Sequence, residues 1–473
     1  MTYLIALGCA LLSGAAFYSS TGLGSFWPLA WLAPIPVLWL AFKEARGWTV
    51  FFAALAAAVL GGLNLLVGYA ADFPPPVLAV LAPAAILLPA LLFALAVMGA
   101  RLVAQRVSPP AAIAAFAALW TAFDYLLSSL GPNGAALSPA YSQVGMPYLI
   151  QGASIFGVWV VSFVLGFFAA GIAMAVATRR AAPAVLAAAL LLADGAYGLW
   201  RISTAPATAS VLVGLAADDA LIAKRFQADE TSALAVVEAY AGAGRELTAN
   251  GANLLVFPER VAVLEPAWRG EAMANLETVA HIGHATLVIG FDERGAERRN
   301  GAVIFFANGA PPQTYFKRHL VPGLERAFVP GTASFMLADR TGIAICKDMD
   351  FPAMLRRDAV LEPTLYAVPA WDFGKDRWWH ARLAIMRGVE NGFSVARAAN
   401  DGLLTLSDAY GRVLAEKPSR PGGMVTLLGV LPRGPGHTLY ARVGDAFAWV
   451  AAALAVLLLG VALAAPKRTQ STI

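Results

Sequence analysis

The chain has 473 residues, of which 59% are hydrophobic and 14% are charged, and its formal net charge is +4. Soluble globular proteins are about half apolar and about a quarter charged, so much of this chain is expected to face lipid. The small net charge and the lack of a Lys/Arg run exclude the basic surface of nucleic-acid-binding proteins. With only Cys9 and Cys346, a disulfide scaffold is excluded as well.

Eight apolar stretches predict transmembrane helices, because each is close to the ~17 to 25 residues that a helix needs to cross a bilayer. They lie at residues 3–19, 27–42, 49–70, 77–100, 110–130, 149–178, 183–200 and 446–464. The first stretch is expected to remain a helix and not a cleaved signal peptide, because no Lys or Arg precedes it and further spans follow at once. We therefore expect seven transmembrane helices within residues 1–201 and an eighth at 446–464.

The connections between these stretches alternate in charge. Connections 20–26 and 131–148 are uncharged, whereas basic residues follow the second, fourth, sixth and eighth stretches: Lys43, Arg46, Arg101, Arg106, Arg179, Arg180, Lys467 and Arg468. Positive connections mark the cytoplasmic side, which predicts that both termini are cytoplasmic and that residues 202–445 lie outside. The Ala-rich composition is typical of a bacterial chain, so we expect a multi-pass inner-membrane protein with this segment on the periplasmic or outer face.

Residues 205–440 carry most of the charged residues, and short β-type runs alternate there with helical patterns. This predicts an α/β domain that is long enough to bury a core of its own. The expected strands are ASVLVGLA, NLLVFP, ATLVIGF, GAVIFFA, TGIAIC, TLYAVPA, FSVARAA and GLLTLSD. The expected helices are residues 229–249, 266–283, 351–358 and 376–390.

Three reactive side chains each follow an apolar run in this domain: Glu259 in NLLVFPER, Lys317 in TYFKRHLVPGLE and Cys346 in TGIAICKDMDFP. Strand ends are where α/β folds expose functional groups. A thiol nucleophile needs a base, a cation that favours the thiolate and the oxyanion, and a turn that exposes its sulfur. Each residue alone has a structural alternative: a buried small residue for Cys346, a turn for Glu259 and a solvated face for Lys317.

In this order the three pieces resemble the Glu-Lys-Cys triad of the nitrilase (carbon-nitrogen hydrolase) superfamily. The eight spans around them resemble the apolipoprotein N-acyltransferase family. The resemblance includes LSPAYSQVGMPYLIQGASIFGVWVVSF, KRHLVPGLE, RGVENGFSVARAANDG and TLYARVGD. It implies a multi-pass α-helical membrane bundle with a nitrilase-like catalytic domain, an α-β-β-α sandwich, at residues 205–440.

The resemblance also implies a ping-pong acyl transfer that needs no cofactor. Glu259 would act as general base, Cys346 would take an acyl chain from a phospholipid as a thioester, and Lys317 would stabilise the oxyanion. The α-amine of a diacylglyceryl-cysteine at a lipoprotein N-terminus would then accept the acyl chain. A membrane setting suits this reaction because both substrates are anchored in lipid.

Five further residues are candidates for supporting or substrate-binding roles. Glu325 in PGLERAF matches a further Glu that the family places near its triad, with a surface carboxylate as the alternative. Lys347 and Asp348 stand where the family typically has an aromatic residue and a Glu, so Lys347 would lower the thiol pKa or bind another anionic group. Trp371 and Trp378 are candidates for an acyl-chain pocket or an interfacial anchor, with core packing as the alternative.

Other functions are less well supported by the sequence. His281, His284 and His380 have no carboxylate or Cys partner at a ligand spacing, so no metal is expected. A transporter should place ionisable residues inside its spans, and Asp124 and Asp194 are thin support for that. Because WWHARLAIMRGVENGFSVARAANDG looks equally like soluble amidases, a membrane-bound amidase or an N-acyltransferase with another amine acceptor remains the main alternative.

Overall fold

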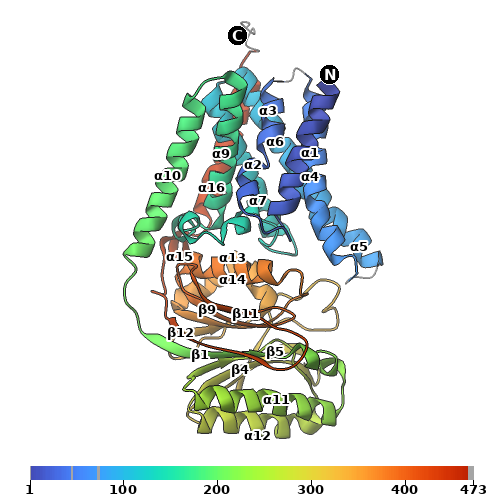
Figure 1. The fold of residues 1–473 in the computed structure, drawn as a ribbon, viewed down its shortest axis with the longest axis vertical. Coiled ribbons are helices and arrows are strands. Elements are labelled where there is room, and N and C mark those ends of the chain that lie inside the picture. The colour runs from blue at the N-terminus through green and yellow to red at the C-terminus, as the bar shows by residue number, and fades with distance from the viewer. Residues whose placement is uncertain (1, 44–45, 72–74, 467–473) are drawn as a thin grey trace. The chain divides into compact units, whose positions relative to one another are not determined.

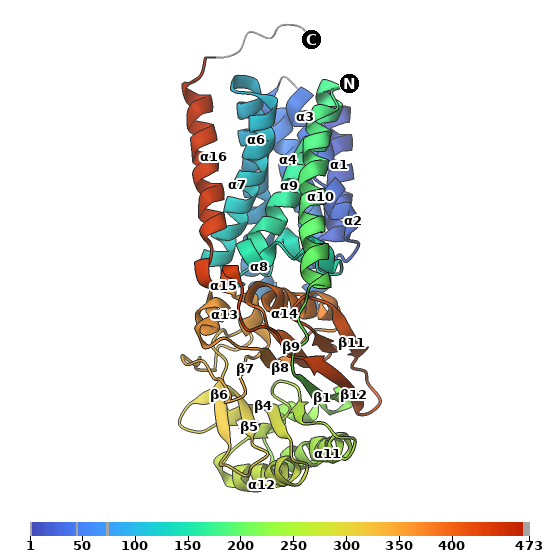
Figure 2. The same ribbon diagram turned by 90° about the vertical axis from the view of Figure 1, so that its left-hand side faces the viewer.

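The computed structural model of the chain describes residues 2–43, 46–71 and 75–466. The chain divides into two compact units, a helical unit made of Met1–Thr204 with Val443–Ile473 and an α/β unit made of Ala205–Arg442. Figures 1 and 2 show these units as a bundle of helices and as stacked sheets flanked by helices. Lys467 and Arg468, expected after the last span, lie outside the described residues.

The helices of the helical unit have the length and apolar composition of transmembrane helices. Among the described residues, seven helices are long and apolar enough to cross one. They are α1 (Thr2–Ser20), α4 (Gly47–Tyr69), the continuous helix Pro83–Arg106 that contains α6 (Leu88–Arg106), α7 (Pro109–Leu130), α9 (Val158–Thr178), α10 (Ala182–Ser203) and α16 (Ala446–Ala464). Shorter helices are α2 (Pro28–Leu32), α3 (Ile35–Lys43), α5 (Pro75–Ala82), α8 (Ala153–Phe156) and α15 (Leu439–Val443). The chain is therefore a multi-pass membrane protein.

Residues 27–42, where the sequence predicts one transmembrane helix, form two short helices instead. They are α2 and α3, which together run back alongside α1 (Figure 1). Pro34 and Pro36 explain the break, because proline lacks the N–H of the helical hydrogen bond and its ring clashes with the preceding turn. The expectation of about eight spans is thus close to the structure, whose described residues form seven long apolar helices and one short, broken helical segment.

The α/β unit contains two sheets. The seven-stranded sheet has the order β12-β1-β2-β4-β5-β6, with β3 paired to β4, and the five-stranded sheet has the order β11-β10-β9-β8-β7. The first sheet comprises β1 (Ser210–Ala217), β2 (Leu254–Val256), β3 (Val263–Leu264), β4 (Thr286–Arg294), β5 (Arg298–Phe305), β6 (Gln313–Phe316) and β12 (Val425–Pro432). The second comprises β7 (Thr341–Ile343), β8 (Leu365–Trp371), β9 (Ser394–Asn400), β10 (Leu403–Ser407) and β11 (Val413–Pro418).

Helices cover the outer face of each sheet. The layer of α11 (Glu230–Ala249) and α12 (Pro266–Ile282) covers the first sheet, and α13 (Pro352–Asp358) and α14 (Arg377–Asn391) cover the second (Figure 1). The inner faces of the two sheets meet in a common apolar core. This confirms the predicted α-β-β-α sandwich. Its central strands are buried on both faces, which is why they read as nearly continuous apolar runs in the sequence.

The first and last strands of the α/β unit are neighbours. β1 and β12 pair antiparallel along their whole length, from Ser210 opposite Pro432 to Ala217 opposite Val425. Strands β1, β2 and β4 are parallel to one another, as are β7, β8 and β9. The carboxyl ends of the parallel strands in each sheet therefore lie at one edge, where loops can bring side chains from distant parts of the chain together.

Gly290 in β4 lies against the backbone of the turn that follows β2. A Cβ at Gly290 would lie 2.6 Å from the Glu259 Cα and 2.8 Å from the Arg260 amide nitrogen, distances that real Cβ atoms do not adopt. We expect Gly290→Ala to displace this turn and to lower the free energy of unfolding by about 1 to 3 kcal/mol. Denaturant unfolding of the purified protein measures this effect. At Gly295 nothing lies within 4 Å of an added Cβ, so Gly295→Ala is the control, and equal losses would contradict the close approach.

Candidate active site

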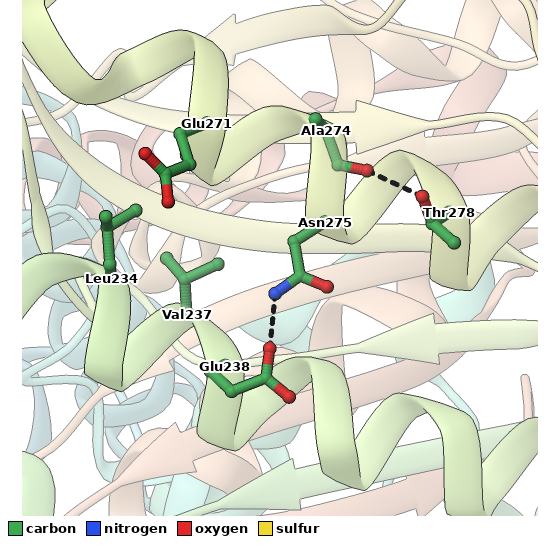
Figure 3. Close-up of a pocket in the computed structure, with 7 residues that line it drawn as sticks. All are labelled: Leu234, Val237, Glu238, Glu271, Ala274, Asn275 and Thr278. Carbon is green, nitrogen blue, oxygen red and sulfur yellow. Dashed lines mark hydrogen bonds between the residues drawn. The ribbon is translucent and has the colours of Figure 1, made fainter.

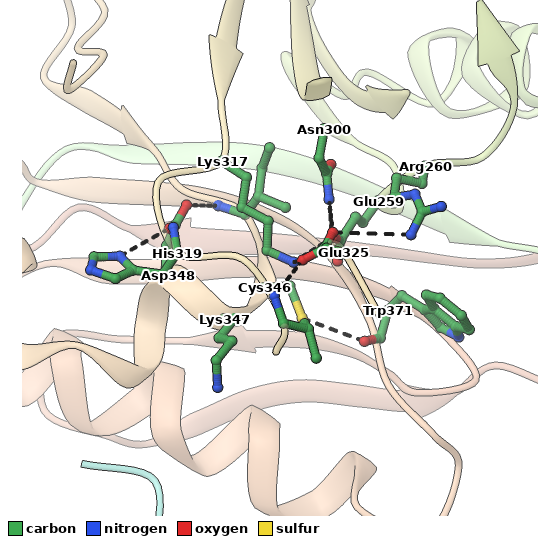
Figure 4. Close-up of polar contacts among 12 residues, drawn as sticks. Glu259, Arg260, Asn300, Lys317, His319, Glu325, Cys346, Lys347, Asp348 and Trp371 are labelled. Carbon is green, nitrogen blue, oxygen red and sulfur yellow. Dashed lines mark hydrogen bonds and ion pairs between the residues drawn. The ribbon is translucent and has the colours of Figure 1, made fainter. Parts of the chain in front are cut away.

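Four polar side chains converge at the ends of strands in the α/β unit (Figure 4). Glu259 comes from the turn after β2, Asn300 from β5, Lys317 from the residue after β6, and Glu325 from the loop that follows. The Lys317 Nζ lies 2.7 Å from the Glu259 Oε1 and 3.0 Å from the Glu325 Oε2. The Asn300 amide donates to both carboxylates at 2.6 Å. One ammonium and one amide therefore join two carboxylates.

These groups are charged although they are buried, with Glu259, Lys317 and Glu325 only 1% to 3% exposed. Burial alone would lower the pKa of Lys317, but Glu259 and Glu325 raise that pKa above its ordinary value. Burial would likewise raise the pKa of Glu325, but Lys317 and the Val321 N–H, which donates at 2.7 Å, hold that pKa below its usual range. The cluster therefore keeps an ammonium and an ionised Glu325 at neutral pH.

Cys346 lies in a strained turn after β7. It opens the short 3₁₀ turn Cys346–Asp350 with a φ of +44°, a left-handed conformation that non-glycine residues rarely adopt and that costs on the order of 1 to 3 kcal/mol. The residue is partly exposed, and its thiol donates to the Trp371 carbonyl oxygen at 3.4 Å. Figure 4 shows the sulfur next to the Glu259 and Lys317 side chains. Such an outlier at the meeting point of strand ends indicates a functional position.

The surroundings of Cys346 keep its thiol protonated at rest. Burial and the charge of Glu259 raise the pKa of Cys346 well above its ordinary value, and Lys317 opposes this rise only in part. A protonated thiol beside a carboxylate and an ammonium suits activation by a general base at the moment of attack. The arrangement can therefore perform nucleophilic acyl chemistry without a preformed thiolate.

Asp348 holds this turn in place. Its buried carboxylate accepts hydrogen bonds from the Tyr315 hydroxyl at 2.7 Å and from the backbone N–H groups of Ile345 at 3.0 Å and His319 at 2.9 Å. Burial would raise the pKa of Asp348, but the hydrogen bonds from His319, Tyr315 and Ile345 keep that pKa below its ordinary value. Asp348 thus joins β6 and the segment after Lys317 to the Cys346 turn.

Of the other predicted residues, Trp371 contacts the thiol through its carbonyl oxygen, whereas Lys347 and Trp378 contact other groups. The Lys347 ammonium lies 3.3 Å from the Asp350 Oδ2 and points away from the sulfur (Figure 4). Trp371 contributes its carbonyl oxygen to the thiol. Trp378 lies in α14, where the Arg382 guanidinium stands 5.0 Å from the centre of its ring. Lys347 and Trp378 therefore face groups other than the thiol.

Two family models match the chain: the apolipoprotein N-acyltransferase N-terminal domain at residues 11–171 and the carbon-nitrogen hydrolase domain at residues 223–426. Relatives named apolipoprotein N-acyltransferase include one from Azotobacter vinelandii, 29% identical over 96% of this chain and 94% of its own length. Another, from Geobacter metallireducens, is 28% identical over 73% of each chain. The chain resembles the apolipoprotein N-acyltransferases over nearly its whole length. Its α/β unit is a carbon-nitrogen hydrolase domain, and the enzyme is an acyltransferase.

Solved structures similar to this chain include amidases. A mutant amidase of the nitrilase superfamily from Nesterenkonia AN1 is 22% identical, with a TM-score of 0.41, and the match covers 52% of this chain and 97% of that chain. A carbon-nitrogen hydrolase from Helicobacter pylori is 17% identical, with a TM-score of 0.39, over 47% of this chain and 89% of that chain.

Sequence reasoning missed three polar residues of this acyltransferase site. Asn300 lies between the two carboxylates of the cluster. Asp372 and Arg397 form a bidentate ion pair at the end of β8 and in β9. A signal was present for Arg397, because it interrupts an otherwise apolar strand, where a polar side chain needs a buried partner.

A hollow on the outer helices lies apart from these groups (Figure 3). It is lined by residues of α11 and α12: Leu234, Val237, Glu238, Glu271, Ala274, Asn275 and Thr278. The carboxylate of Glu238 is exposed and accepts a hydrogen bond from Asn275 and an ion pair from Arg245.

Removing the shared ammonium tests the cluster. Lys317→Met would leave the buried Glu259 carboxylate without its cation and would leave Glu325 with only the Arg260 guanidinium, 4.0 Å away. Breaking a buried ion pair in this way costs about 3 to 5 kcal/mol. We expect a loss of that size in the free energy of unfolding, measured with denaturant. Lys417→Met, which removes an exposed ammonium from β11, should change stability by less than about 0.5 kcal/mol. A loss no larger for Lys317→Met than for this control would contradict the bridging role.

His380 predicts an alkaline loss of stability. Its Nε2 lies 3.2 Å from the Asp376 Oδ2. Burial would lower the pKa of His380, but Asp376, then Asp372, raise that pKa to about 9. Protonated His380 therefore stabilises the folded state fully below its ordinary pKa of about 6.5, and this contribution is lost as the pH rises through about 9.

Thermal unfolding between pH 6 and pH 10 measures this contribution. The shift in pKa corresponds to at most roughly 3 kcal/mol of stability. We expect His380→Gln to lower stability at pH 6 and to change it little at pH 10. The exposed His281 supplies the control variant, His281→Gln, which should keep the wild-type pH dependence. An unchanged slope in His380→Gln would show that His380 is not the titrating group.

Proposed function

We propose that this enzyme transfers a fatty acyl chain from a phospholipid to the N-terminal amine of a diacylglyceryl-cysteine lipoprotein, through a thioester on Cys346. The observation that carries this proposal is the convergence of Glu259 and Lys317 on the thiol of the partly exposed Cys346. Residues 205–440 are the catalytic domain in this proposal. The names of the relatives, apolipoprotein N-acyltransferase, support the lipoprotein as acceptor.

In the first half-reaction the Cys346 sulfur attacks the ester carbonyl carbon of the phospholipid. Glu259 takes the thiol proton as the C–S bond forms, and the Lys317 ammonium stabilises the negative oxygen of the tetrahedral intermediate. The C–O ester bond then breaks, and Glu259 returns the proton to the leaving alkoxide. The products are the acyl thioester on Cys346 and a lysophospholipid.

In the second half-reaction the lipoprotein amine attacks the thioester carbon. Glu259 accepts a proton from the amine as the C–N bond forms, and Lys317 again stabilises the oxyanion. The C–S bond breaks, and the proton passes from Glu259 to the sulfur, which restores the thiol. Glu325 and Asn300 serve this cycle by holding Glu259 and Lys317 at fixed distances, so that little reorganisation is needed in the transition state.

The helical unit provides a lipid environment for both substrates. Two adjoining hollows in this unit share a mostly apolar lining that includes Phe93 and Trp120, and one of them also reaches Asp124 and Asn133. Such a lining suits an acyl chain. We place the α/β unit on the periplasmic face of the bacterial inner membrane with both termini in the cytoplasm, as the basic connections of the helical unit favour.

Intact-mass analysis after incubation with phospholipid tests the proposal. Wild-type protein should gain the mass of a fatty acyl group, and hydroxylamine should remove it because it cleaves thioesters. Cys346→Ala should gain no mass, whereas Cys9→Ala should behave as wild type because Cys9 lies in α1, within the helical unit. In Glu259→Gln the adduct should form about 10² to 10⁴ times more slowly, the usual contribution of a general base.

The acceptor is tested by adding a diacylated lipopeptide to the acylated protein. The adduct should disappear with formation of a triacylated peptide and should persist in water alone. Wild-type protein that gains no adduct and instead hydrolyses small amides would overturn the proposal in favour of a membrane-bound amidase. Discharge by simple amines as fast as by the lipopeptide would indicate an N-acyltransferase with another acceptor.

A further inference from the structure

A second buried ion pair stands behind the nucleophile and has no part in the triad. Asp372 directly follows Trp371 at the end of β8, and Arg397 lies in the neighbouring strand β9. The Arg397 Nη1 lies 2.9 Å from the Asp372 Oδ2, and its Nη2 binds the other carboxylate oxygen. Asp372 is fully buried and Arg397 is 2% exposed. The pair is thus a two-pronged contact shielded from water, the strongest geometry available to these side chains.

The position of Asp372 is fixed from several sides. Its backbone N–H donates to the Asn400 carbonyl oxygen at 3.0 Å. A Cβ at Gly402 would lie 2.4 Å from the Asp372 Oδ2, so the carboxylate occupies the space that a side chain at position 402 would need. Because Asp372 follows Trp371, whatever fixes Asp372 also fixes the Trp371 carbonyl, which accepts the Cys346 thiol at 3.4 Å.

Stability alone is a weak reason for such a pair. Taking two charges out of water is expensive, and buried ion pairs are often replaced by apolar residues without loss of stability. An Arg in the apolar strand FSVARAA, paired with an Asp next to the residue that holds the nucleophile, is better explained by an effect on that nucleophile.

We propose that the Asp372–Arg397 ion pair positions Cys346 for acyl transfer: Arg397 holds the Asp372 carboxylate, and Asp372 fixes the adjacent Trp371 carbonyl, which accepts the hydrogen bond from the thiol. This inference rests on the proposed function, in which Cys346 is the nucleophile. Asp372 and Arg397 are positioning residues here, because they act on the thiol and not on the substrate.

The charges around the thiol agree with this arrangement. Four charged groups on four segments influence Cys346: Glu259 after β2, Lys317 after β6, Asp372 after β8 and Arg397 in β9. After burial, Glu259 has the largest effect and raises the thiol pKa, and Asp372 raises it further, whereas Lys317 and Arg397 lower it. Burial would lower the pKa of Arg397, but Asp372 raises that pKa, and a Cys346 thiolate would raise it further. The two members of the pair therefore act on the thiol with opposite signs.

Because Asp372 raises the thiol pKa and Arg397 lowers it, removing one charge or the other should shift that pKa in opposite directions. A pair with a purely structural role would not produce this result. In a Cys9→Ala background, the rate of Cys346 alkylation by iodoacetamide is measured against pH by intact mass. Asp372→Asn should move the midpoint of this curve to lower pH, and Arg397→Gln should move it to higher pH, each by about one pH unit. At a pH between the two midpoints, the single variants should differ by at least about tenfold in alkylation rate.

Two further variants keep the test decisive if a single variant unfolds. The double variant Asp372→Asn with Arg397→Gln keeps an amide in each position without charge, and its midpoint should return close to that of the wild type. Arg397→Lys keeps the cation, so its midpoint should also stay close. Thermal unfolding identifies the variants that remain folded. Midpoints that stay unchanged in folded single variants, or that move in the same direction, would overturn the inference.

Alkylation separates this inference from the proposed function. The reaction reports on the thiol alone and needs neither phospholipid nor lipopeptide. Opposite midpoint shifts in a protein that never forms an acyl adduct would overturn acyl transfer as the function and would leave the effect of the pair on Cys346 intact. An acyl adduct on the wild type combined with unmoved midpoints would overturn the inference alone.

Discussion

The arrangement of the α/β unit depends on one buried ammonium, that of Lys317, which lies between two carboxylates. Each charge loses its hydration on burial, and only close, multiple contacts can compensate for that loss. Lys317 contacts Glu259 and Glu325 at once, and Asn300 donates to both. These contacts require the ends of three strands and one loop to meet at a single place, which the stacked sheets provide. The stacked sheets therefore hold these buried charges, whose loss of hydration is costly, at the distances that their contacts require.

The proposed nucleophile, Cys346, depends on the same frame through its backbone. Cys346 and Arg260 both have positive φ values, and each stands in a turn that presents a member of the proposed triad. Asp348 holds one of these turns with hydrogen bonds to the segment after β6, and Gly290 leaves room for the other. Strain at two turns is tolerated because neighbouring strands fix both sides of each turn.

The fold class and most of the elements could be predicted from the sequence because their signals are local. Buried strands such as β4 and β9 are continuous apolar runs, and α11 and α12 follow helical patterns with the expected bounds. Strands β3 and β6 were missed since they have two and four residues, and β11 and β12 were missed since few of their residues are buried. The division of α2 from α3 could have been read from the prolines of the sequence APIPV.

The chemistry of single residues was predictable only where a motif existed. Glu259, Lys317 and Cys346 could be selected because a resemblance joined three pieces that are far apart in the chain. The partnership of Asn300 with two carboxylates is set by the register of β5 and β6, which no local pattern encodes. In the same way, the direction of the Lys347 side chain depends on Asp350 and could not be derived from its place beside the nucleophile. Tertiary contacts, and not residue types, decide these roles.

The pairing of β1 with β12 also constrains how this enzyme is made. Between synthesis of Ala217 and of Val425, one edge of β1 has no partner, since its neighbour in the finished sheet is the last strand of the domain. A ribosome delivers these strands in order, so the sheet closes only when nearly the whole domain has been synthesised. Until then an open strand edge can pair with other chains. Biogenesis of this enzyme therefore depends on protecting the open edge of β1 until β12 has been synthesised.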